Sequence, residues 1–135
     1  MLSSGNAAFV VLGAGASQIA FVGASSVLLA GGSGQAIVAA DAGSNEFIAG
    51  TGTLDVTGGG GRNAYVFHAN SGLLKLEDFS LAKGDTLTVD KALQGALHQT
   101  SDGQGGTMLT FGTGATHGVD IRGMATMPTT SIIWA

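Results

Sequence analysis

Apolar residues recur in short runs along the first half of the chain, and each run is followed by glycine and small polar residues. Cutting the sequence at these runs gives seven units of about nine residues, from FVVLGAGAS at 9–17 to NAYVFHANSG at 63–72. One unit carries a single-residue insertion and another a deletion. A short apolar run followed by a glycine-rich stretch is typical of a strand and a tight reversal. The pattern therefore predicts a regular array of strands and turns.

Two such units make one turn of a flattened, right-handed parallel β-roll. Each unit then lies over the unit two places earlier, about 4.8 Å away. We expect the units that begin at residues 9, 27, 46 and 63 to form one sheet, and those that begin at 18, 36 and 54 to form the other. Glycine gathers at the fifth to eighth positions, where a reversing chain often needs a positive φ. Residues 1–72 are thus predicted to form a nonapeptide β-roll.

The pattern changes from residue 73 onward, where longer strands are expected at 73–79, 85–90, 106–112 and 117–124. Residues 91–97 are expected to form one short helical turn, and residues 101–106 form a glycine-rich hairpin loop. The predicted fold class is all-β: a right-handed parallel β-roll or β-helix closed by an antiparallel β cap at residues 73–135. The two parts are expected to form one continuous structural unit.

The amino-acid composition argues against several classes of function. The chain has 135 residues with 24 glycines, no cysteine and a net charge of −4, and its five Lys and Arg are dispersed. Nucleic-acid binding is therefore not expected, and disulfides, thiolate catalysis and thiolate metal sites are excluded. Residues 7–30 are uncharged, but no Lys or Arg precedes Arg62 and the repeat runs through them. Both observations argue against a membrane span and against a cleaved signal peptide.

The segment GGGGRNAYV at 58–66 resembles the repeats-in-toxin nonapeptide G-G-x-G-x-D-x-U-x, with Asn63 at the aspartate position. GGSGQAIVA at 31–39 matches with Ala36 in that position. The resemblance implies Ca²⁺ bound between stacked turns by aspartates and carbonyl oxygens. In this chain the aspartate column reads Gln18, Val27, Ala36, Glu46, Leu54 and Asn63. We therefore expect no required cofactor and at most weak Ca²⁺ binding, with the candidate residues Glu46, Asn63, Asp78 and Asp85. A plain turn role, accepting backbone N–H groups, is equally open for Asp78 and Asp85.

A second resemblance covers residues 65–89, where YVF is followed by L-E-D-F-x-x-x-x-G-D-x-L-x-V. This block is similar to the segment after the last repeat in proteins exported by type I secretion. It implies a noncatalytic C-terminal folding cap and export module of a secreted or cell-surface protein, recognised by an ABC transporter. The uncharged tail at 127–135 suits an uncleaved export signal, and its Ile133 and Trp134 can also close the core as a final strand.

No catalytic constellation stands out, and we expect the chain not to be an enzyme. The three histidines, His68, His98 and His117, lack the spacing of a zinc site. Asp102 and Asp120 are interpreted as loop residues. Two alternatives stay open: an adhesive or carbohydrate-binding β-solenoid, and a fragment of a polysaccharide-modifying enzyme. The acids that the roll offers to such an enzyme, Asp41, Glu46 and Asp55, are expected to lie scattered.

An excess of apolar residues predicts an interface. Neighbouring residues of a strand point to opposite faces, yet the second and third positions are both apolar in the first five units. In the family's pattern the third position faces inward, so the second should face outward. We expect contacts with an upstream solenoid, or self-association through these apolar β-faces. The predicted interface residues are Val10, Leu28 and Phe47 on one face and Ile19 and Ile37 on the other.

Overall fold

The computed structural model describes residues 2–3, 7–22, 26–40, 43–112 and 117–135. Regular structure in these segments consists of β-strands and two short 3-10 helices. In chain order they are β1 (Leu2–Ser3), β2 (Ala7–Val11), β3 (Ser17–Val22), β4 (Ser26–Ala30), β5 (Gln35–Ala40), β6 (Asn45–Ile48), β7 (Thr53–Thr57), β8 (Asn63–Phe67), β9 (Leu73–Leu76), β10 (Thr86–Val89), η1 (Lys91–Ala96), β11 (Leu97–Ser101), β12 (Thr107–Phe111), β13 (Gly118–Ile121), η2 (Thr129–Ser131) and β14 (Ile132–Trp134).

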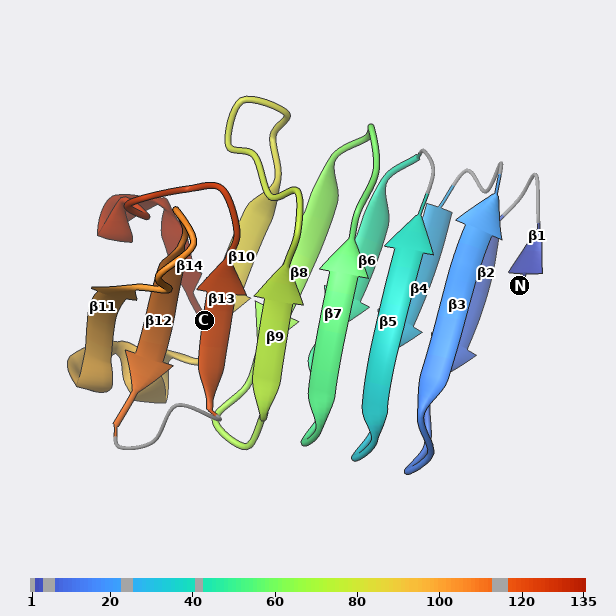
Figure 1. Cartoon of the computed structure of the whole chain (residues 1–135), viewed down its shortest axis with the longest axis horizontal. Helices are drawn as coiled ribbons and strands as arrows, with labels where there is room; N and C mark the ends of the chain where they lie inside the picture. Colours follow the sequence, from blue (N-terminus) through green and yellow to red (C-terminus); the bar gives the residue numbers. More distant parts are fainter. Residues whose placement is uncertain (1, 4–6, 23–25, 41–42, 113–116) are drawn as a thin grey trace.

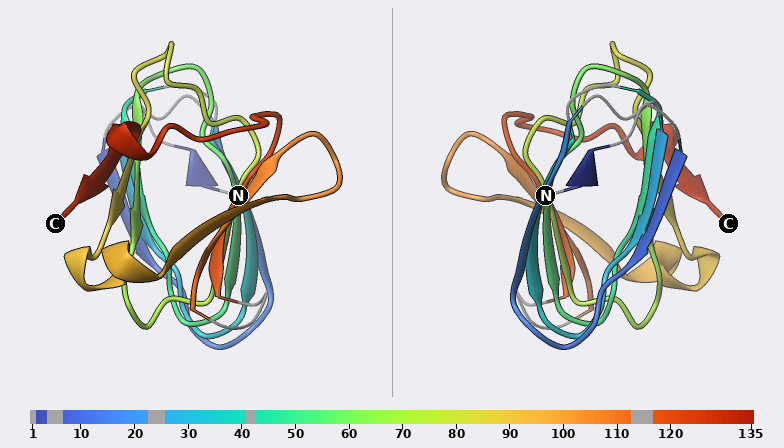
Figure 2. Two further views of the ribbon diagram at one scale, coloured as in Figure 1. Left: turned by 90° about the vertical axis from the view of Figure 1, so that its left-hand side faces the viewer. Right: turned by 90° about the vertical axis from the view of Figure 1, so that its right-hand side faces the viewer.

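The strands form two sheets that face one another (Figure 1). The front sheet has the order β1-β3-β5-β7-β9-β13-β12-β11, and the back sheet has the order β14-β10-β8-β6-β4-β2. The chain alternates between the sheets from β2 to β10, and neighbouring strands in this region are parallel. Front strands run up and back strands run down as the chain advances from its N-terminus, so the coil is right-handed (Figures 1 and 2). The predicted fold class is confirmed.

The predicted pairing of units is confirmed as well. The units that begin at residues 9, 27, 46 and 63 contribute β2, β4, β6 and β8 to the back sheet. The units that begin at 18, 36 and 54 contribute β3, β5 and β7 to the front sheet. Inward-facing residues form apolar columns across the strands, and in the back sheet Phe47 stacks on Tyr65 with ring centroids 5.5 Å apart. Burying such columns is the main stabilising contribution in a stack of coils.

The interface prediction is wrong for three of its five residues. Val10, Ile19 and Phe47 face the core. Phe47 pairs with both Leu29 and Tyr65. The unit beginning at residue 46 is thus offset by one residue from those beginning at 27 and 63. A one-residue offset exchanges the two faces of a strand.

The other two predicted interface residues do face outward. Leu28 lies on the outer side of the back sheet, in register with Phe9 and Glu46. Ile37 lies on the outer side of the front sheet and is 54% exposed. Each outer face therefore keeps one of the predicted interface residues, but not the complete rows that the repeat columns predicted.

Glycine in the turns permits successive coils to stack at close range. A Cβ atom on Gly52 would lie 2.1 Å from the carbonyl oxygen of Gly34. The same carbonyl accepts a hydrogen bond from Thr53 N at 3.1 Å. A side chain at position 52 would therefore displace the turn ladder.

The chain leaves the parallel coils after β10. η1 leads into the β11–β12 hairpin, which is antiparallel, and β12 is antiparallel to β13. β13 returns to lie parallel beside β9, and β14 lies parallel beside β10. The predicted antiparallel cap and the helical turn are confirmed, but the cap begins later than residue 73, because β9 and β10 still belong to the parallel coils. The predicted final strand is present as well, but Ile132 faces the core while Ile133 is exposed.

A single cluster of buried apolar residues runs from Val27 in β4 to Ile132 in β14. The coils and the cap therefore share one core. Within the described part of the chain, no helix has both the length and the apolar character needed to cross a membrane.

Candidate functional site

Three polar side chains form a ladder where β6, β8 and β10 begin. Asn45 Nδ2 donates to Asn63 Oδ1 at 2.9 Å and to Gly58 O at 3.2 Å. Asp85 Oδ1 accepts a hydrogen bond from Asn63 N at 2.9 Å. All three side chains are buried. The ladder therefore supplies hydrogen bonds to turn backbone that is out of reach of water.

Asp78 and Asp85 anchor neighbouring turns. Asp78 accepts hydrogen bonds from Gly58 N at 2.8 Å and Gly59 N at 2.9 Å. Asp85 Oδ2 accepts a hydrogen bond from Ser80 N at 2.9 Å. Both carboxylates thus have the turn role that was predicted as one of two possibilities.

Of the four calcium candidates, the structure brings Asn63, Asp78 and Asp85 together and separates Glu46 from them. Asn63 contacts Asp85, and Lys83 lies within ion-pair distance of both aspartates. Among the described residues there is no group of three or more His, Cys, Asp or Glu side chains that could hold a metal ion. The ammonium group of Lys83, rather than a third acid, accompanies these three residues.

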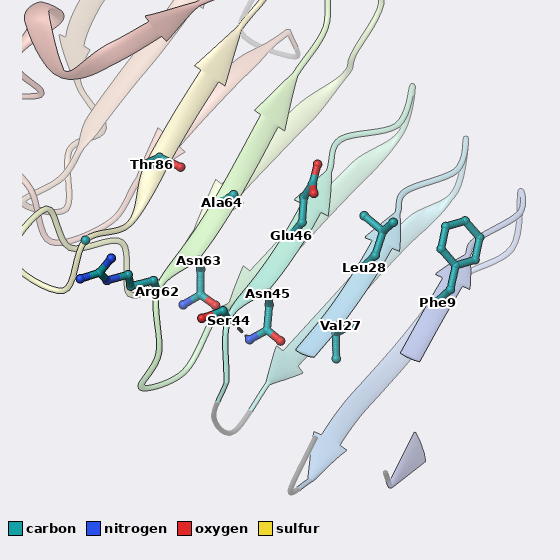
Figure 3. A pocket seen from close by; sticks show the side chains of 11 residues that line it. Phe9, Val27, Leu28, Ser44, Asn45, Glu46, Arg62, Asn63, Ala64 and Thr86 are labelled. Atoms are coloured by element: carbon teal, nitrogen blue, oxygen red, sulfur yellow. Dashed lines mark hydrogen bonds between the residues drawn. The ribbon is translucent and has the colours of Figure 1, made fainter. Parts of the chain in front are cut away.

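Glu46 instead lies on the outer face of the back sheet, beside a shallow hollow of about 590 Å³ (Figure 3). Phe9, Leu28 and Ala64 line this hollow from neighbouring strands, and Arg62 lies at its edge. Phe9 is 69% exposed. This face is therefore mainly apolar, with one acid and one base beside it.

The outer face of the front sheet is charged at its C-terminal end. Asp55, Lys75 and Asp120 are in register on β7, β9 and β13. In the row beside them, Arg122 Nη1 lies 3.9 Å from Glu77 Oε1. Of the roll acids considered for an enzyme, only Asp55 belongs to this cluster. Glu46 lies on the opposite sheet, and Asp41 lies outside the described residues.

Two pairs of carboxyl groups lie close to one another in this charged cluster, Asp55 with Glu77 and Asp102 with Asp120. Burial, followed by a side-chain hydrogen bond with Glu77 and the charge of Glu77, raises the pKa of Asp55 to about 6. Burial and a hydrogen bond with Asp102 likewise raise the pKa of Asp120. Two carboxyl groups can share a hydrogen bond only if one of them keeps its proton. Asp55 and Asp120 therefore keep their protons to a higher pH than exposed carboxyl groups do.

Asp102 is the partner that stays ionised. Its Oδ1 accepts hydrogen bonds from Gln104 N at 2.7 Å and Gly106 N at 2.8 Å, and the Gln104 bond is the leading cause of its lowered pKa. These bonds confirm the predicted loop role of Asp102. Asp120 was interpreted in the same way and is corrected, because it lies within strand β13.

The charged cluster was missed in the sequence, although a signal for it exists. Lys75 and Glu77 are two residues apart, as are Asp120 and Arg122, which places each pair on one face of a strand. Only the pairing of β13 with β9 brings the two pairs together.

Two of the three histidines have contacts typical of a structural role. His68 Nδ1 lies 3.0 Å from Asp90 Oδ1. His117 Nδ1 donates a hydrogen bond to the Ser71 carbonyl, and its ring packs against Phe67 with centroids 5.3 Å apart. These contacts link neighbouring turns of the coil.

The two ends of the coil stack are built differently. At the C-terminal end the core columns finish at Ile121 and Ile132, which are 0% and 4% exposed. At the N-terminal end, Val10, Leu12 and Ile19 pack on the core but are only half-buried. β2 is the edge strand of the back sheet. No protein-family model and no curated protein matches this chain.

Proposed function

We propose that the chain is a noncatalytic closing module of a β-solenoid, which acts as the C-terminal folding cap and export domain of a secreted or cell-surface protein. The observation that carries this proposal is the difference between the two ends of the stack. The cap covers one end of the core with η1, the β11–β12 hairpin and β14, while the other end presents partly buried apolar residues. A solenoid needs such a polar closing element at its end.

The open end is suited to accept a further coil, supplied by upstream sequence or by another chain. Leu12 N donates a hydrogen bond to Ala30 O, so the N–H of Val11 points away from β4 by the alternation of a strand. The first charged residue of the sequence is Asp41. Edge strands that avoid pairing usually carry charge or proline, and β2 (Ala7–Val11) carries neither.

Association at the open end is tested by a proline on β2. We expect the wild-type chain to self-associate at high concentration in sedimentation velocity, and Val11→Pro to stay monomeric, since proline removes the outward N–H. Val11→Ala is the matched control: it also shortens the side chain but keeps the N–H, and should still associate. A wild-type chain that is monomeric at every concentration would contradict the stacking role.

Export is the part of the proposal that rests on the resemblance of residues 65–89 and of the tail. In this reading the chain passes an ABC transporter unfolded and then folds outside the cell, with the cap first and the coils following. A reporter fused ahead of the chain should appear in the medium of cells that carry a type I secretion apparatus. It should stay inside when the ABC transporter is deleted or when residues 127–135 are removed. Transporter-independent release would refute the export role and leave the closing role standing.

A further inference from the structure

Lys83 places its ammonium group between two successive turns of the coil. Its Nζ donates a hydrogen bond to the carbonyl oxygen of Gly59 at 2.7 Å. The same nitrogen lies 3.5 Å from Asp85 Oδ2 and 3.6 Å from Asp78 Oδ2. Gly59 belongs to the turn that precedes β8, whereas Lys83 and Asp85 belong to the turn that precedes β10. One positive charge therefore joins the two turns.

The carboxylates around this ammonium are held in place by the backbone. Asp78 accepts hydrogen bonds from the N–H groups of Gly58 and Gly59, and Asp85 accepts from those of Asn63 and Ser80. The Asp85 side chain is 0% exposed. Carboxylates that are buried and fixed need a compensating positive charge. In the part of the chain that the structure describes, Lys83 is the one cation within 4 Å of these two carboxylates, so two negative charges face one ammonium group there.

A further oxygen lies beside this junction without a partner. Tyr65 is fully buried, and its hydroxyl has no hydrogen-bond partner among the described residues. The hydroxyl lies against Gly58, where an added Cβ atom would be 2.2 Å from it. Burial, followed by the charges of Asp78 and Asp85, raises the pKa of Tyr65. The phenol therefore faces the turn that Asp78 holds and keeps its proton.

We propose that these oxygens form a cation site whose occupant is the chain's own Lys83, standing where a bound metal ion would otherwise join the two turns. Carboxylate, carbonyl and hydroxyl oxygens are ligands that Ca²⁺ accepts in irregular geometry. A tethered ammonium fills the site without any ion from the medium. Removing it leaves an oxygen-lined site with two negative charges, which a divalent hard cation can occupy.

Thermal unfolding of the full chain tests this site. We compare wild type and Lys83→Met in a chelator and in 10 mM CaCl₂, because methionine keeps most of the apolar stem and removes the charge. In chelator, the midpoint of Lys83→Met should fall by about 5 °C or more, and Ca²⁺ should restore most of that loss. The wild-type midpoint should move by less than about 1 °C on adding Ca²⁺. Mg²⁺ should restore less, since it demands a closer octahedral arrangement.

Two further variants control for other effects of charge. Lys91→Met removes an exposed lysine of η1 and should show no response to Ca²⁺. The double variant Lys83→Met/Asp78→Asn removes one carboxylate and should lose most of the Ca²⁺ response. If Lys83→Met does not fold in chelator, circular dichroism during a Ca²⁺ titration tests the proposal instead, because Ca²⁺ should then restore the folded structure. The proposal is wrong if Ca²⁺ neither raises the midpoint of Lys83→Met nor restores its structure.

Discussion

The inward-facing apolar columns begin and finish with similar residues at the two ends of this solenoid, but these residues are buried to different extents. In the back sheet the column begins at Val10, which is half-buried, and finishes at Ile132, which is 4% exposed. In the front sheet it begins at Ile19 and finishes at Ile121, which is 0% exposed. The residues are alike in type, and the difference lies in what covers them. An apolar column thus contributes its full burial energy only where a neighbouring coil or cap lies on both sides.

Turns near the N-terminal end and turns in the middle of the stack differ in the same way, in how closely other backbone packs against them. A Cβ atom on Gly15, in the turn before β3, would contact no atom within 4 Å, whereas one on Gly52 would meet the backbone of the preceding turn. Among the described residues, the buried polar ladder starts at Asn45. Close packing at a turn therefore depends on a preceding coil to stack against.

The largest expected effect compares two phenylalanines. Phe67 is 0% exposed and packs on Phe111 with ring centroids 5.3 Å apart, whereas Phe9 is 69% exposed on the edge strand. We expect Phe67→Ala to lower the free energy of unfolding by about 4 kcal/mol because it leaves a large cavity. Phe9→Ala should cost less than about 0.5 kcal/mol. Urea unfolding of both variants measures the contrast, and equal losses would remove the distinction between the covered core and the outer face of the edge strand.

A smaller effect compares two glycines. Gly52→Ala should lower the free energy of unfolding by about 2 kcal/mol, since the added methyl group pushes apart two stacked turns. Gly15→Ala should be neutral or stabilise the chain by up to about 0.5 kcal/mol, because alanine restricts the unfolded chain. Thermal unfolding of the two variants measures both changes in stability. Tolerance of alanine at position 52 would mean that the turns stack less closely than described.

The smallest effect concerns pH and the charged outer face of the front sheet. The pKa of Asp55 is about 6 in the folded chain, against an ordinary value of 3.8, so between these values the folded state binds more protons. Stability should therefore fall as the pH rises from about 4 to 6. The expected fall is below about 1 kcal/mol, because solvent screens this half-buried pair. Asp55→Asn should flatten that part of the profile, and an unchanged slope would assign it to another group.

Much of the architecture could be predicted from the sequence. Apolar runs separated by glycine predicted the strands, their division between two sheets and the antiparallel cap. The inward face was predicted correctly at Leu29 and Tyr65 but wrongly at Val10, Ile19 and Phe47. Repeat units that differ by one residue in length do not define their own register, and a single step exchanges core and surface.

The candidate sites were predictable to a smaller extent. Asn63, Asp78 and Asp85 were named as oxygen-bearing residues at the end of the roll, and they do meet. Glu46 was named on the same grounds and lies on an outer face. Lys83 was not named, because its partner Gly59 O is 24 residues away along the chain. No local pattern relates two positions that far apart unless the number of residues in each coil is known.

The sequence by itself determined the alternation of strand and turn, since apolar side chains must be buried and glycine permits tight reversals. The tertiary structure decided which residue of each apolar pair faces the core and which charges become neighbours. It also decided that one end of the stack is closed. These outcomes depend on the register between coils, which is set by hydrogen bonds and packing across strands that lie about twenty residues apart along the chain.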